Sequence, residues 1–529
     1  MHRFNRCDPL RWTKVLFVLV IALCQVACQP PRQSTRLIVA SAGKINSLDP
    51  AKANTFGALQ LLSALGDTLY RLNGKGQLEP RLAAAHPQIS DGGLTVSIPL
   101  RKDVLFHDGT PFNAAAMAFS LQRFQRIDAL NYVLGGRIAA VETPSPYLLR
   151  LRLTRPSSSL DGLLTSINLT PVSPTAYAAH MDEALNKRFI GTGPYRLSSF
   201  QAQQQRLEPF SDYWGIPSSN AGINFINLSN STALFGALRN SEVDVLLSDS
   251  LDADQQRLLH RLAKQGKLRE GEGPPLEIGY ITLLSNAAPL NKPILRQALA
   301  YSINRALISE RVSYGMRQPQ RSLIPPNLPG GEESPWPSYS PQKAREQLKQ
   351  AGYCKNKQLT LPLTFRTNVP ADKLLALTWQ AQVAQDLSDC LTINIDGIEA
   401  ITVRDQLDKG AFQAVILEWR GDYPDPEAYL TPLLSCNKAK GSICEAGEAV
   451  LSGSFWTKPG LNKALRRSDQ LRGLERLQQI KAVERQAAEG AAYLPVWLVT
   501  PRAWAQLRLA KPEFNNNGQL LLTKLRLLN

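Results

Sequence analysis

Apolar and polar positions follow two periods along this chain. Alternating residues predict half-buried strands at 148–153 and 391–398, and continuous apolar runs predict buried strands at 37–40 and 243–247. An i, i+3, i+7 repeat after Asn113 predicts a helix that this residue caps. Further helices are predicted at 54–72, 293–315, 341–351, 372–387 and 461–488, and further strands at 94–100, 201–207, 359–365, 415–419 and 494–499. This mixture predicts the α/β class, with mixed sheets and more than one domain.

The first 28 residues have the pattern of an export signal. Four arginine or lysine residues precede an apolar run at 15–24, and the small residue Ala27 precedes Cys28. The run is shorter than the roughly 20 residues that a membrane span needs. We expect a signal peptide at 1–27, lipidation of Cys28 and a polar tether at 29–34. Ordinary cleavage without a lipid is the alternative.

Size and charge narrow the class of protein. About 500 residues remain after the signal, enough for two or three domains. Apolar residues make up 43% and charged residues 20%, which is ordinary for a globular protein. The net charge of +16 falls to +13 without the signal, and acidic residues interrupt the basic clusters. We therefore expect no binding to nucleic acid.

Four cysteines follow Cys28, namely Cys354, Cys390, Cys436 and Cys444. An even number in an exported protein predicts two disulfides, and three pairings are possible. We favour Cys436–Cys444, which closes a short loop, and Cys354–Cys390. The latter two precede the two strands of a strand–helix–strand unit, whose parallel starts should lie together. A zinc site is the rival interpretation, but the spacing lacks paired CxxC motifs.

Motifs of enzymes are absent from the sequence. There is no Walker loop, HExxH, GxSxG or GxGxxG motif. Ser340-Pro-Gln-Lys343 matches SxxK, but a serine before a proline is better explained as a helix N-cap. The histidines have no ligand spacing. We expect no enzyme activity, no metal site and no cofactor.

Two carboxylates stand out in a loop after a predicted strand. Asp422 and Asp425 are surrounded by Trp419, Tyr423 and prolines. A carboxylate beside aromatic rings suits the ammonium group of a ligand. We favour ligand contact for Asp422, and a structural turn for Asp425.

Eight short segments together resemble one protein family. They are Ser47–Pro50, Leu78–Ala83 with Ser90–Gly92, Leu100–Pro111, Gly191–Tyr195, Tyr213–Gly215, Leu295–Arg305, 344–353 and Trp419–Pro426. On these segments the chain is similar to the family 5 extracellular solute-binding proteins, the peptide- and nickel-binding components of ABC importers. Each segment alone is weak, but eight in the same order are specific.

The resemblance implies a two-lobe α/β fold of the periplasmic-binding-protein (Venus flytrap) type with mixed sheets and an additional small domain. The first lobe would comprise 28–74, 189–272 and 491–529, the extra domain 75–188, and the second lobe 273–490. Ligand would bind in a cleft between the lobes, which close on it.

The resemblance also implies a site. In peptide-binding relatives, an aspartate just after a strand-ending tryptophan pairs with the α-ammonium group of the ligand. The matching residue here is Asp422, with Trp419 three positions earlier. The expected ligand-binding residues are Asp422, Trp419, Arg420 and Tyr423. Arg420 departs from a position that is usually small or uncharged, and this suggests a second, anionic ligand group.

The implied function is that of a periplasmic, membrane-anchored lipoprotein. It would capture peptides, deliver them to ABC permease subunits and act as a monomer. The alternatives are the same fold binding a chelated metal, an oligosaccharide or an opine-like solute, or a receptor that presents its ligand to a signalling partner.

Overall fold

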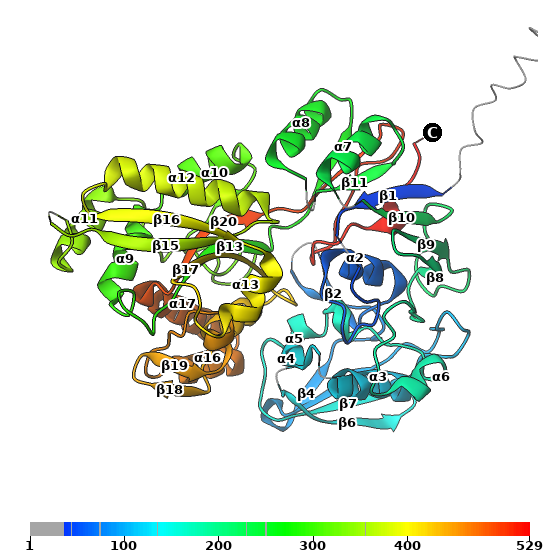
Figure 1. Cartoon of the computed structure of the whole chain (residues 1–529). Helices are drawn as coiled ribbons and strands as arrows, with labels where there is room; N and C mark the ends of the chain where they lie inside the picture. Colours follow the sequence, from blue (N-terminus) through cyan, green and yellow to red (C-terminus); the bar gives the residue numbers. More distant parts are fainter. Residues whose placement is uncertain are drawn as a thin grey trace, which may run out of the picture.

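The computed structural model describes residues 36–528 apart from residues 44, 74, 75, 128, 135, 229, 249, 250 and 355. The predicted signal peptide, Cys28 and the tether at 29–34 lie outside the described residues. Figure 1 shows two bodies side by side, with a smaller layer of strands and helices below one of them. The two-lobe α/β fold with mixed sheets is thus confirmed.

The first lobe is built on a seven-stranded sheet with the order β12-β21-β11-β1-β10-β9-β8. Its central strand β1 runs parallel to β10 and β11, and the other pairs are antiparallel. Val39 and Ala40 of β1 are fully buried, as the apolar run predicts. The elements are β1 (Leu37–Ser41), α2 (Phe56–Leu65), β8 (Tyr195–Phe200), β9 (Gln204–Pro209), β10 (Ile223–Asn227), α7 (Ser231–Arg239), β11 (Val245–Leu247), α8 (Ala253–Lys264), β12 (Arg269–Glu272) and β21 (Arg502–Ala505).

The extra domain is an antiparallel sheet with the order β4-β5-β7-β6, and helix α3 lies against it (Figure 1). Asn113 caps α3 as predicted, since its side chain accepts a hydrogen bond from the backbone of Ala116. A short hairpin of β2 and β3 joins this domain to the first lobe. The elements are β2 (Tyr70–Leu72), β3 (Leu78–Pro80), β4 (Gln88–Ser90), β5 (Thr95–Pro99), α3 (Ala114–Ile127), α4 (Asn131–Leu134), β6 (Ile138–Ser145), β7 (Leu148–Leu153), α5 (Leu160–Leu163) and α6 (Pro174–Tyr177).

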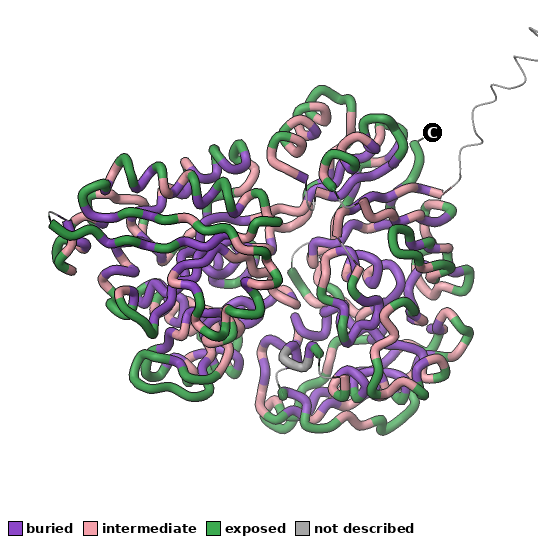
Figure 2. The backbone as a smooth tube through the Cα atoms, viewed as in Figure 1, coloured by how far each residue is buried: buried purple, intermediate pink, exposed green. Residues whose placement is uncertain are grey.

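The second lobe is built on a six-stranded mixed sheet with the order β14-β20-β13-β17-β15-β16. Figure 2 shows its central strands buried beneath partly exposed helices. The strands are β13 (Glu277–Leu283), β14 (Gln318–Pro319), β15 (Leu359–Arg366), β16 (Leu391–Ile398), β17 (Ala414–Arg420), β18 (Lys438–Lys440), β19 (Ile443–Ala446) and β20 (Tyr493–Val499). The helices are α9 (Pro293–Ser302), α10 (Arg305–Ser313), α11 (Pro341–Gln350), α12 (Pro370–Asp386), α13 (Ala400–Leu407), α14 (Glu427–Leu434), α15 (Glu448–Leu451), α16 (Leu461–Gln470) and α17 (Gly473–Gly490).

Strand β20 lies in a different sheet from the one expected. We placed residues 491–529 in the first lobe, but β20 pairs with β13 in the second lobe, and the chain returns to the first lobe only at β21. An apolar run shows that a strand is buried, and it does not show which sheet the strand joins. The chain therefore crosses between the lobes at 273–276 and again at 500–501.

Three predicted helices are shorter than their apolar pattern. The helix expected at 54–72 ends at Leu65, because Gly66 is extended and packs closely against Thr170. The helix expected at 293–315 is divided by Asn304, which caps α10. The helix expected at 461–488 is divided into α16 and α17 before Gly473, whose φ of 56° is left-handed.

Among the residues that the structure describes, two disulfides are formed, and they join the favoured pairs. Cys354 is bonded to Cys390, and Cys436 to Cys444. β15 and β16 are parallel with Leu359 opposite Leu391, so the residues before them meet as expected. Among the described residues, no helix has both the length and the apolar character to cross a membrane.

Candidate ligand-binding site

The candidate site lies where strand β17 ends at the boundary between the lobes. β17 lies between β13 and β15, and its last residues are Trp419 and Arg420. The segment 421–426 then leaves the sheet and leads into α14. We call residues 419–423 the candidate ligand segment.

Trp419 holds this segment in place. It lies opposite Ile278 of β13 and packs against the core of the second lobe. Its indole Nε1 donates a hydrogen bond of 2.9 Å to the carbonyl of Ala428 in α14. The ring therefore joins the end of the strand to the helix that follows.

Arg420 reaches from the second lobe to the first. Its guanidinium group donates to the carbonyl of Asn517 and lies 5.8 Å from the ring centroid of Phe56 on α2. Gly518 leaves room for it, because a Cβ there would lie 2.9 Å from Nη2 of Arg420. Arg420 is thus a cation that touches both lobes.

Asp422 also lies at this boundary. Its backbone carbonyl accepts a hydrogen bond of 3.2 Å from the hydroxyl of Ser166, which follows α5. Its side chain is partly buried. The structure therefore places one cation and one anion two residues apart, where the second lobe meets the first lobe and the extra domain.

Tyr423 points into the protein. It is buried, its hydroxyl donates to Glu427, and Arg137 of the extra domain approaches the hydroxyl to 3.5 Å. Burial, followed by the charge of Glu427, raises the pKa of Tyr423 well above its usual value. Tyr423 therefore anchors the segment, and its predicted contact with ligand stays a prediction.

Asp425 has the structural role that the sequence favoured. Its carboxylate accepts two hydrogen bonds from Arg476 of α17, at 2.7 and 2.9 Å. It also accepts one from the backbone of Glu427 at the start of α14.

A cluster of charges beside the segment was missed by sequence reasoning. Glu277 lies opposite Arg420, and Gly279 lies opposite Glu418, so these positions share one face of the sheet. Arg317 and Arg366 approach Glu418 to 2.7 and 3.3 Å. These residues come from strands β13, β15 and β17 and from the turn before β14, and only the tertiary fold brings them together.

The cluster shifts the ionisation of its two glutamates in opposite directions. Burial, and then the charge of Glu418, raises the pKa of Glu277 to about 7. Burial works against ionisation of Glu418, but Arg317 and Arg366 outweigh it and lower its pKa. The face beside the candidate segment therefore carries an acid whose charge changes near neutral pH.

Within the described part of the chain, two groups have the composition of a metal site. One contains Cys354 and Cys390, which are bonded to each other. The other is His260, Glu270 and Glu272, but Arg502 already lies 3.5 and 2.9 Å from its two carboxylates. An ion there would have to displace a guanidinium group.

Two lobes joined by two crossings, with charged side chains at their boundary, define a two-lobe solute-binding protein. The model of the bacterial extracellular solute-binding proteins, family 5, matches residues 77–441. The chain belongs to this family, and the resemblance seen in the sequence is confirmed.

Individual relatives agree with this assignment. The glutathione-binding protein GsiB of Salmonella choleraesuis (strain SC-B67) is 29% identical over 366 residues, which cover 68% of this chain and 69% of the relative. Two solved structures share the fold. The dipeptide-binding protein of Pseudoalteromonas sp. SM9913 in complex with Met-Leu has a TM-score of 0.78 at 22% identity, covering 93% of this chain and 100% of that one. NikA from Brucella suis in complex with Fe(III)-EDTA has a TM-score of 0.81 at 19% identity, with the same coverage.

Proposed function

We propose that this protein captures a small peptide between its lobes and delivers it to the permease of an ABC importer, without catalysing a reaction. The observation that carries the proposal is the presence of a cation, Arg420, and an anion, Asp422, two residues apart where the second lobe meets the rest of the chain. A peptide has an ammonium group at one end and a carboxylate at the other. A site with one anion and one cation suits both ends.

The ligands named for several relatives support this class of solute, whereas NikA is in complex with Fe(III)-EDTA. GsiB is named for glutathione, and the structural neighbours include complexes with Met-Leu and with the peptide STSA. All of these are small peptides. In our proposal Asp422 receives the ligand's ammonium group, and Arg420 receives a carboxylate.

Calorimetry and native mass spectrometry test the proposal. The panel contains reduced glutathione, Met-Leu, a tetrapeptide, a nickel–histidine chelate and a neutral trisaccharide. Binding of at least one free peptide is expected, with affinity at least tenfold weaker after N-acetylation, because acetylation removes the ammonium charge. Binding of the chelate or the sugar alone would overturn the peptide assignment.

We also propose that Cys28 carries a lipid, so that the protein works outside the cytoplasm, tethered to a membrane. The polar residues 29–34 lie between Cys28 and β1 in the sequence, where an anchored protein needs a tether. Mass spectrometry of the mature N-terminus should find an acylated Cys28, and Cys28→Ala should release the protein from membranes. An unmodified Cys28 would overturn the anchor and leave the peptide proposal standing.

A further inference from the structure

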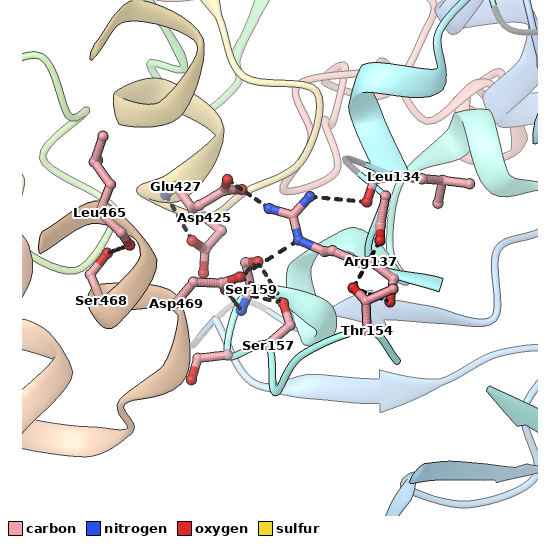
Figure 3. Close-up of polar contacts among 12 residues, drawn as sticks. Leu134, Arg137, Thr154, Ser157, Ser159, Asp425, Glu427, Leu465, Ser468 and Asp469 are labelled. Atoms are coloured by element: carbon pink, nitrogen blue, oxygen red, sulfur yellow. Dashed lines mark hydrogen bonds and ion pairs between the residues drawn. The ribbon is translucent and has the colours of Figure 1, made fainter. Parts of the chain in front are cut away.

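The extra domain touches the second lobe through a buried polar contact. Figure 3 shows the carboxylate of Asp469, at the end of α16, facing the loop before α5. Asp469 accepts hydrogen bonds from the hydroxyls of Ser157 and Ser159, at 3.1 and 2.7 Å, and from the backbone of Ser159 at 3.0 Å. The backbone of Ser158 adds a bond to the carbonyl of Asp469. The extra domain and the second lobe are therefore joined directly.

Arg137 lies at the centre of this contact. Its Nη2 is 2.6 Å from a carboxylate oxygen of Glu427 on α14, and its Nε is 3.6 Å from Asp469 (Figure 3). The side chains of Arg137, Glu427 and Asp469 are only 3%, 9% and 4% exposed. We call Arg137, Ser157, Ser159, Glu427 and Asp469 the Arg137 latch.

The latch has a different energy in the open and closed forms. When the lobes separate, each charged group returns to water and loses its partner at no large cost. When they close, Glu427 and Asp469 are buried. Arg137 is then the cation within 4 Å of both carboxylates, which also accept hydrogen bonds from Tyr423, Ser157 and Ser159. Removing one partner of a buried pair leaves an uncompensated charge, which is strongly unfavourable. A change at Arg137 should therefore destabilise the closed form selectively.

The latch is continuous with the candidate ligand segment. Tyr423 ends that segment, hydrogen-bonds to Glu427 and is approached by Arg137. Asp425, between them, is held by Arg476. Closing the latch therefore determines where the segment lies.

We infer that the Arg137 latch holds the extra domain against the second lobe without help from a ligand, and that Arg137 is a positioning residue for segment 419–423. The extra domain is then part of the clamp, and the ligand adds its own contacts to a closure that the protein already favours. This inference rests on the proposed function, but every contact of the latch is made between residues of this chain.

Small-angle scattering and an interlobe spin-label distance test the latch without any ligand. The full mature chain is compared with Arg137→Met and with the control Arg152→Met. Arg152 lies in the same domain and pairs with Glu142 and Asp91, so it has no part in the latch. Arg137→Met should lower the ratio of closed to open molecules at least tenfold, and Arg152→Met should leave it unchanged. An unchanged distance distribution in Arg137→Met would overturn the inference.

A second variant separates the latch from simple loss of folding. In Arg137→Met combined with Glu427→Gln and Asp469→Asn, no buried charge is left uncompensated. The closed population should then recover toward that of the unmodified chain. A combined variant that is as open as Arg137→Met would overturn the role of charge compensation.

Failure of the latch and failure of the proposed function give different results. If no peptide binds but Arg137→Met opens the molecule, the latch stands and the peptide assignment falls. If Met-Leu or glutathione binds but Arg137→Met stays closed, the latch falls. If Arg137→Met opens the molecule and a peptide binds, its dissociation rate should rise more than its association rate falls, since the closed complex has lost its clamp.

Discussion

At the residue scale, neighbouring side chains of the candidate segment have different structural roles. Trp419 and Tyr423 point toward the protein and hold the segment by hydrogen bonds, while Arg420 crosses to the first lobe. Asp422 lies between Arg420 and Tyr423 in the sequence and contacts Ser166 of the extra domain through its backbone carbonyl. A short segment can therefore be rigid and still present charge to a ligand.

Replacing Asp422 by asparagine should weaken peptide binding by about 10- to 100-fold. A hydrogen bond to a charged group contributes roughly 1.5–3 kcal/mol, and each 1.4 kcal/mol is a factor of ten. Calorimetry with the peptide that binds most tightly measures the loss, and Asp405→Asn, on the exposed face of α13, is the matched control. Equal affinity in both variants would remove Asp422 from the site.

At the element scale, the second lobe is held by its helices and by two covalent links. α17 packs against α16 and α9, and its buried Glu484 binds the loop at 322–324. One disulfide links the residues that precede the parallel strands β15 and β16, and the other closes the β18–β19 hairpin. Each feature supports a separate prediction.

Glu484 should make the stability of the protein depend on pH. Burial raises its pKa from 4.5 to about 7, although Ser322 and the backbone of Leu323 oppose this shift. Its protonated form therefore favours the folded state below pH 4.5, and that stabilisation is lost as the pH rises through 7. As the pH rises from 5 to 8, the free energy of unfolding of the unmodified chain should therefore fall by about 2–3 kcal/mol more than that of Glu484→Gln.

Urea unfolding at the two pH values measures this difference. Glu475→Gln, an exposed residue of the same helix, is the control and should show no such change. If the free energies of unfolding of Glu484→Gln and the unmodified chain differed by the same amount at pH 5 and pH 8, the predicted role of Glu484 in the pH dependence would be contradicted.

The two disulfides should contribute unequally to stability. Their sequence separations are 36 and 8 residues, and a longer loop loses more entropy in the unfolded chain when it is closed. Removing the Cys354–Cys390 link by paired alanine substitutions should cost roughly 3–4 kcal/mol, against roughly 2–3 kcal/mol for Cys436–Cys444. Denaturant unfolding of the two double variants gives the order, and a reversed order would contradict the loop-length argument.

At the scale of the whole molecule, the protein is two bodies with two crossings and a polar boundary. Bonds from Arg420, Ser166 and Arg137 join parts of the chain that lie far apart in sequence. A ligand that contacts both sides shifts the balance toward the closed form by its differential affinity.

A peptide bound at this boundary should stabilise both lobes against heat. At a ligand concentration 100 times the Kd, the gain is about 2.7 kcal/mol. Differential scanning calorimetry with the tightest peptide of the panel should show every unfolding transition moved upward. A shift confined to one of two transitions would place the ligand on a single lobe.

The sequence alone was informative wherever a local pattern carries the information. Several strands of the two large sheets, β1 and β16 among them, and the cap at Asn113 depend on neighbouring residues. Both disulfides follow from the strand–helix–strand unit and from a short loop. The segment at 419–423 stays a prediction, made because a carboxylate follows an aromatic residue at the end of a strand.

Only the tertiary structure decided which distant groups meet. Arg137 and Tyr423 are 286 positions apart, and the cluster around Glu418 draws on three strands and the turn before β14. Strand β20 joined the second lobe although its apolar run fits either sheet. Local periodicity reports which face of an element is buried, whereas the partner is selected by packing over the whole chain. The charges that join the lobes are therefore visible only once the chain has folded.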